Sequence, residues 1–197
     1  MKLSDFKKTL KEAIENKDIN KALQLINEFY DFRLNLIKSQ LFEYLQKIIA
    51  ANNVQIEAIL SDIEYLSIQK DLESRFNLSK DKMKELVLKN QLKVIHPLIF
   101  TAKKKYLYFN YERPLRLYYA RKLNTLIKLK QGYSIYRVSI HNTSCPICSQ
   151  YEGKFLVNGS SNIPDSLDLN DPKNRPPYHF HCKHTLIPVP KDIYESI

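Results

Sequence analysis

Glycine and proline are distributed very unevenly along this 197-residue chain. None of the three glycines comes before Gly132, and seven of the nine prolines come after it. Because both residues interrupt helices, the distribution predicts a helical region over residues 1–131 and a region of loops and short strands over residues 132–197. The predicted fold class is therefore α+β and mainly α, with a boundary near Gly132 between a helical N-terminal region and a small β module.

Apolar residues in the first region recur at the three-and-four spacing of helices that bury one face. Asp18 is suited to cap a helix of about 30 residues, which the pair Asn52–Asn53 is expected to interrupt. Ser79 is expected to cap a later, basic helix. A further helix is expected over residues 114–130, since proline is tolerated in a first helical turn.

Positive charge is concentrated in one segment. The whole chain has a formal net charge of +10, and residues 82–130 alone carry 13 basic and 2 acidic side chains. Such a patch attracts phosphate backbones by releasing counterions, and it attracts acidic protein surfaces equally well. The candidates for contact with nucleic acid or with an acidic partner are Lys103, Lys104, Lys105, Arg113, Arg116, Arg121 and Lys122.

Tyrosines are interleaved with these cations. Aromatic rings can stack on the bases of single strands while the cations neutralise phosphates. The same alternation also suits a half-exposed helix whose lysine stems cover apolar surface. Both interpretations stay open at the level of sequence.

Two broad classes of protein are disfavoured. No stretch of 18 apolar residues occurs, and the chain starts with charged residues where a signal peptide needs an apolar run, so we expect a cytosolic protein without a membrane partner. The three cysteines are an odd number, and Cys145 and Cys148 lie too close in sequence to cross-link a fold. If the cysteines are reduced, the roles that remain for them are metal binding and redox chemistry.

All three cysteines and three of the five histidines gather in two short clusters. The first is Cys145-Pro-Ile-Cys148, whose two thiolates can hold one tetrahedral ion, most often Zn²⁺. The second supplies the further candidates His179, His181, Cys182 and His184. Two of these would complete a four-coordinate structural site. His179 and Cys182 are the first choice because their spacing matches that of the first cluster, and His184 is the strongest substitute.

Two other chemistries fit the same residues. Cys-Pro-x-Cys is also a motif of dithiol oxidoreductases, but a turn-forming stretch rather than a helix is expected after Cys148. A catalytic zinc would keep one position open for water, with a base taken from Glu152, Asp165, Asp168 or His141. A zinc-dependent nucleic-acid-processing enzyme such as a toxin nuclease, and a zinc-containing DNA-binding regulator, are therefore alternatives to a structural role.

Short strands are expected around the two clusters. Residues 133–140 are β-branched and aromatic, which predicts a strand. Residues 152–157 predict a turn into a second strand, residues 158–175 a loop, and residues 186–189 an edge strand, where proline is tolerated. A β module of this size buries little apolar surface by itself, so we expect a bound metal to supply part of its folding free energy.

The order of motifs in the C-terminal region is similar to that of a known family. The motifs are Cys145-Pro-Ile-Cys148, Tyr151-Glu152-Gly153-Lys154-Phe155, Pro176-Pro177-Tyr178-His179-Phe180-His181-Cys182-Lys183-His184 and Leu186-Ile187-Pro188. Residues 132–190 thereby resemble the C-terminal module of tailed-phage minor head proteins, the Mu F-like head morphogenesis and minor capsid family. Members of that family typically have proline and arginine where this chain has Phe180 and Lys183.

The resemblance implies a structural role in virion assembly, without enzymatic activity. A minor head protein of this kind is present in few copies and is associated with the portal vertex. Its partners would be the portal protein and other capsid proteins, with packaged DNA as a further candidate. Its location would be the virion head, and the host cytoplasm during assembly.

Overall fold

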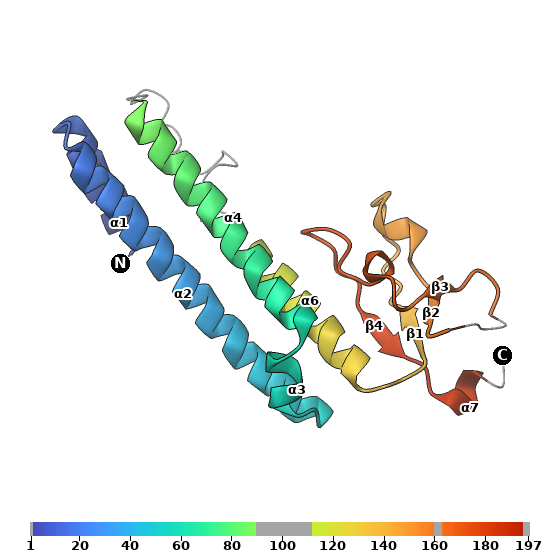
Figure 1. Ribbon diagram of the computed structural model, residues 1–197. Helices are drawn as coiled ribbons and strands as arrows, with labels where there is room; N and C mark the ends of the chain where they lie inside the picture. Colours follow the sequence, from blue (N-terminus) through green and yellow to red (C-terminus); the bar gives the residue numbers. More distant parts are fainter. Residues whose placement is uncertain (1, 90–111, 160–162, 195–197) are drawn as a thin grey trace. The chain divides into compact units, whose positions relative to one another are not determined.

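The computed structural model describes residues 2–89, 112–159 and 163–194 (Figure 1). Helices make up most of these residues, and the strands form one small sheet towards the C-terminus. The predicted α+β, mainly α fold class is therefore confirmed. Among the described helices, none combines the length and the apolar content that a membrane span requires.

The first of two compact units consists of Met1–Leu41 together with Gln69–Arg113. It contains α1 (Leu3–Glu15) and the adjoining parts of two long helices, α2 (Ile19–Asn52) and α4 (Ile63–Leu88). Side chains at helical spacing form its core, as the apolar pattern predicts. They include Phe6, Leu10, Ile26, Phe29, Tyr30, Leu72 and Phe76.

The predicted start and end of α2 are confirmed. The Asp18 carboxylate accepts a backbone N–H from the first turn of α2 at 3.0 Å, and α2 ends at Asn52, followed by Asn53 with a left-handed φ of 52°. Ser79 was wrongly expected to be a cap. It lies buried inside α4, where its hydroxyl is 3.3 Å from the Tyr30 hydroxyl. A partner on the neighbouring helix, which a sequence does not reveal, satisfies this polar group.

The second compact unit consists of Phe42–Ile68 and Pro114–Ile197. Besides the end of α2 and the start of α4, it contains α3 (Ile56–Leu60), α6 (Glu112–Lys130), the sheet and α7 (Lys191–Tyr194). Because α3, most of α6 and parts of α2 and α4 belong to this unit and precede Gly132, the compact units do not divide at the boundary expected from glycine and proline.

Four strands form the sheet in the order β3-β2-β1-β4: β1 (Ile135–Val138), β2 (Phe155–Val157), β3 (Leu167–Asp168) and β4 (Leu186–Pro188). β1 pairs antiparallel with β2 and β4, and β3 pairs parallel with β2. The three predicted strands are present, with β4 at an edge. β3 lies in a stretch that was predicted to be a loop. A strand of two residues is too short to show an alternating pattern in the sequence, so the prediction missed it. The core of the module is formed by Tyr136, Val138, Leu156, Leu169 and Leu186.

Hydrogen bonds tie α6 to the loops and the edge strand of the sheet. The Thr125 hydroxyl donates to the Pro176 carbonyl at 2.7 Å. The Lys128 ammonium group donates to the Thr185 hydroxyl at 3.1 Å and to the Leu186 carbonyl. Burial lowers the pKa of Lys128, because it disfavours the charged ammonium group. The hydrogen bonds to these two acceptors stabilise the ammonium group in this partly buried position. α6 and the β module are thus parts of one folded unit.

Candidate metal centre

Cys145 and Cys148 lie on a tight knuckle in the loop between β1 and β2. The Cys145 carbonyl accepts the N–H of Ser149 at 3.0 Å, and a short 3-10 helix, Cys148–Gln150, follows. The Thr143 hydroxyl accepts the N–H of Cys145 at 3.1 Å. These bonds fix the backbone that carries both sulfur atoms.

The sheet brings the second cluster to this knuckle. Val138 at the end of β1 is paired with Leu186 at the start of β4. The chain that leaves β1 towards Cys145 and the chain that enters β4 from Cys182 therefore run from the same end of this strand pair. The N–H of Cys182 donates to the His179 carbonyl at 3.0 Å, which closes a turn in the second cluster.

The structure brings five of the six candidate donors together, and His181 belongs to neither group. His179 Nε2 lies 3.3 Å from Cys145 Sγ and 3.0 Å from Cys148 Sγ. Cys182 Sγ lies 3.7 Å from Cys148 Sγ and 3.7 Å from His184 Nδ1. The donors form two overlapping groups that share Cys148, and within each group the donor atoms lie within 4.8 Å of one another.

These separations fit the edges of a tetrahedral metal site. Zinc–sulfur bonds of about 2.3 Å and zinc–nitrogen bonds of about 2.0 Å at the tetrahedral angle place two sulfurs about 3.8 Å apart, and sulfur about 3.5 Å from nitrogen. The Cys148–Cys182 and Cys182–His184 separations, both 3.7 Å, agree with those edges. The cluster can therefore bind a metal ion with little rearrangement of these three side chains.

His184 is oriented as a metal ligand. It is 2% exposed, and its Nε2 lies 3.2 Å from Glu152 Oε1. A neutral imidazole carries one N–H, which this carboxylate places on Nε2. The lone pair of Nδ1 then faces Cys182 and the rest of the cluster. This carboxylate–histidine arrangement is the usual support of a metal-binding imidazole.

His179 faces the cluster with the other ring nitrogen, Nε2. Its Nδ1 accepts the backbone N–H of His181 at 3.2 Å, so the ring proton belongs on Nε2. That Nε2 faces the sulfurs of Cys145 and Cys148 as a donor. The hydrogen bonds therefore favour His184 over His179 as the nitrogen ligand, whereas sequence spacing had placed His179 first.

Glu152 connects the knuckle to His184. Its Oε1 accepts the N–H of His141, and its Oε2 accepts the N–H of Thr143 at 3.2 Å. These interactions lower the pKa of Glu152, the hydrogen bond from the His141 backbone most of all. The sequence suggested this carboxylate as a catalytic base. In the structure both of its oxygens accept hydrogen bonds, so its position suits holding His184 in place.

The thiols differ in acidity according to their surroundings. Backbone N–H groups, first that of Cys148, lower the pKa of Cys145. Burial raises the pKa of Cys148 to about 12, and the neighbouring Cys182 and Cys145 add to the effect. Thiolates packed this closely repel one another, and a divalent cation removes that repulsion. Metal binding should accordingly release protons.

The predicted basic contact residues have different surroundings. Lys103, Lys104 and Lys105 lie outside the described residues, and Arg113 is described only by its backbone in α6. Arg116 is partly buried on α6. Arg121 donates to the Cys182 carbonyl at 2.6 Å, and the Lys122 ammonium lies 5.0 Å from the centre of the Tyr118 ring. Arg121 thus links α6 to the loop that carries the second donor cluster, a role that its charge alone does not indicate.

Comparisons of the chain with protein-family models, with curated proteins and with solved structures found no significant match. The functional interpretation therefore depends on the geometry of the donor cluster and on the motifs of the sequence.

Proposed function

We propose that this chain is a structural assembly protein of the tailed-phage minor head class, and that one structural Zn²⁺ holds its C-terminal module together. The observation that carries the zinc proposal is the meeting of two clusters, more than 30 residues apart in sequence, in two groups of donors that share Cys148. The Cys148–Cys182 and Cys182–His184 separations fit edges of a tetrahedral site, and Cys145, which belongs to the other group, would move towards Cys182 and His184 on metal binding. The assignment to minor head proteins depends on the resemblance of residues 132–190.

The ligands we propose are Cys145, Cys148, Cys182 and His184. Three thiolates and one imidazole suit zinc, which favours sulfur and nitrogen donors. His179 then donates its Nε2–H to the sulfurs and reduces their negative charge. When bound, zinc supplies a fixed tetrahedral centre to a module whose buried apolar core is small.

A structural role is better supported than catalysis. Four protein donors are available to close the coordination sphere, whereas a catalytic zinc keeps one position for water. Glu152, whose carboxylate contacts the candidate ligand His184, accepts hydrogen bonds from three groups and is poorly placed to remove a proton from a substrate. The basic segment over residues 82–130 supports contact with DNA or with an acidic surface of the portal.

Metal analysis tests the zinc proposal. The full chain, purified without chelators, should contain one zinc per molecule, and Cys145→Ser and Cys182→Ser should each lose it together with the fold of the β module. His181→Ala is the matched control, since this exposed histidine offers no atom to either donor group. A wild-type chain that is folded and free of metal would overturn the proposal.

Co-expression with a tailed-phage portal protein tests the assembly role. We expect a complex that survives purification and weakens as salt increases, because charge contributes to the contact. Zinc content without any association with portal or capsid proteins would leave the metal assignment intact and remove the viral one.

A further inference from the structure

One face of the small sheet packs on the core of the β module, and part of the other face is open. Successive residues of a strand point to opposite faces, so Tyr136 and Val138 of β1 point into the core and Arg137 points away from it. Arg137 is directly opposite Phe155 of β2 and Ile187 of β4. Because directly opposite residues share a face, these three side chains lie side by side on three adjacent strands.

Apolar side chains make up most of this patch, which we define as Arg137, Ile140, Phe155 and Ile187. Ile140 is 53% exposed and Ile187 is 46% exposed, while Phe155 is half-buried. Ile140 follows β1, and its side chain lies 3.5 Å from the position that a Cβ atom on Gly153 would take, with Arg137 Nη2 3.7 Å from the same position. The members of the patch are therefore contiguous, and contiguous exposed apolar residues indicate an interaction site.

The Arg137 guanidinium is held in place without an anionic partner. Its Nε–H donates to the Gly153 carbonyl at 3.1 Å, and its Cζ lies 5.5 Å from the centre of the Phe155 ring. Among the residues that the structure describes, no carboxylate forms an ion pair with Arg137. Glu152 is adjacent in sequence to Gly153, but its carboxylate accepts hydrogen bonds from other groups. An oriented guanidinium within apolar surface is complementary to a carboxylate, which it can bind through two N–H groups.

The edge of the sheet at β4 is poorly suited to an added strand. Alternate residues of an antiparallel strand turn their backbone groups to the neighbouring strand and to the free edge. The Ser139 N–H donates to the Thr185 carbonyl, so Leu186 and Pro188 face the free edge. The Leu186 carbonyl accepts a hydrogen bond from Lys128, and proline has no N–H. Half of the backbone groups that a strand would use at these two residues are therefore absent or occupied, which favours a partner that packs on the face.

We propose that this patch binds an amphipathic helix of a partner protein whose apolar stripe carries one carboxylate, with that carboxylate on Arg137 and the apolar side chains on the rest of the patch. A helix of this kind covers an open sheet face in the way that layers pack within domains. Arginine and aromatic residues are enriched at protein interfaces. The patch contains no proposed zinc ligand and no residue of the basic segment, so the inference goes beyond the proposed function and does not depend on it.

Two designed helical peptides test the proposal on the full-length chain as purified. The peptides carry leucines at three-and-four spacing and differ only in one position of the leucine stripe, which is glutamate in one and glutamine in the other. By calorimetry, we expect the glutamate peptide to bind about fivefold more tightly, since one partly exposed ion pair contributes about 1 kcal/mol. Arg137→Gln should remove this preference, and Ile187→Ser should weaken binding of both peptides.

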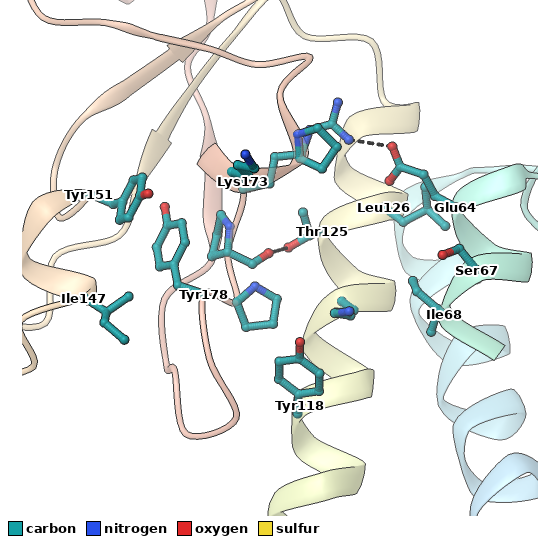
Figure 2. A pocket seen from close by; sticks show the side chains of 15 residues that line it. Glu64, Ser67, Ile68, Tyr118, Thr125, Leu126, Ile147, Tyr151, Lys173 and Tyr178 are labelled. Carbon is teal, nitrogen blue, oxygen red and sulfur yellow. Dashed lines mark hydrogen bonds and ion pairs between the residues drawn. The ribbon is translucent and has the colours of Figure 1, made fainter. Parts of the chain in front are cut away.

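Lys173→Gln and Leu66→Ser are the matched controls. Lys173 is an exposed cation of the β module that lines a separate cavity of about 510 Å³ (Figure 2), and Leu66 is 52% exposed on α4. Both variants should bind the glutamate peptide as wild type does, and circular dichroism checks that every variant is folded. The proposal is overturned if the glutamate peptide does not bind, if Arg137→Gln keeps the preference, or if Ile187→Ser binds as well as wild type. A wild-type dimer that Ile187→Ser dissociates would also overturn it, because a second copy would then cover the face.

Discussion

Replacing Glu152 with glutamine removes one negative charge while keeping the size and shape of the side chain. The carboxylate accepts hydrogen bonds from two backbone N–H groups and from His184 Nε2. A glutamine has one acceptor oxygen, so its NH₂ group must face at least one of these three donors. The substitution therefore disturbs the link between the knuckle and His184 without touching a proposed ligand.

The expected cost follows from the position of Glu152 behind the ligand. Loss of the partner of a metal-bound histidine typically lowers metal affinity 10- to 100-fold, or about 1.4 to 2.7 kcal/mol. Glu152→Gln should therefore keep zinc at high protein concentration but lose it to a competing chelator more readily than wild type. Asp165→Asn is the matched control, because it removes the same charge from an exposed position of the same module.

Cobalt substitution separates the two histidines. Co²⁺ in a tetrahedral site of three sulfurs and one nitrogen gives intense visible bands, which weaken when a ligand is replaced by water. We expect His179→Gln to retain these bands, since an amide N–H can still donate to the sulfurs, and His184→Ala to change them. Retention by His184→Ala together with loss in His179→Gln would reverse our assignment of the nitrogen ligand. Equal zinc affinity of Glu152→Gln and wild type would refute the role given to Glu152.

Two further predictions concern stability, measured by chemical denaturation. Asp62 is paired with Lys130, and although burial opposes ionisation, this partner and backbone N–H groups lower the pKa of Asp62 overall. A carboxylate with a lowered pKa stabilises the fold at pH values above its unfolded-state pKa near 4, and this stabilisation is lost as pH falls through the folded-state pKa. Asp62→Asn should therefore lower the free energy of unfolding by about 0.5 to 1 kcal/mol at pH 7 and by almost nothing well below pH 3. Phe29 is fully buried and stacked on Phe6 with centroids 4.0 Å apart, so Phe29→Ala should lower the free energy of unfolding by about 3 to 5 kcal/mol. A cost that does not change with pH for Asp62→Asn, or one below about 1 kcal/mol for Phe29→Ala, would contradict these estimates.

The sequence predicted the features that depend on local pattern. The absence of glycine before Gly132 predicted the helices, and alternating β-branched and aromatic residues predicted β1. Spacing also predicted which cysteines and histidines the structure brings close enough together to hold a metal ion, since two short clusters contain every cysteine. Local pattern was insufficient where a distant partner decides the outcome, as for Ser79, whose hydroxyl lies beside that of Tyr30 on another helix.

The nitrogen ligand illustrates the same limit at the candidate site. In sequence, His179 lies three residues before Cys182 and His184 two residues after it, and the match with the spacing of the first cluster favoured His179. Glu152 and one backbone N–H place the ring proton on Nε2 in both histidines, but His184 faces the cluster with its unprotonated Nδ1 and His179 faces it with the protonated Nε2. Identification of the ligand therefore requires the tertiary contacts of each ring.

Arg121 shows why counting cations overestimates a binding surface. The excess charge of residues 82–130 made every arginine of α6 a candidate for contact with nucleic acid. Arg121 instead donates to the carbonyl of Cys182, itself a proposed zinc ligand. A hydrogen bond from a charged group contributes about 1.5 to 3 kcal/mol. The bond from Arg121 therefore stabilises both the packing of α6 on the β module and the conformation of the loop that carries Cys182. Removal of zinc should consequently affect α6 as well as the donor loops, and the basic helix and the metal module should act as one unit in any complex with DNA or with the portal.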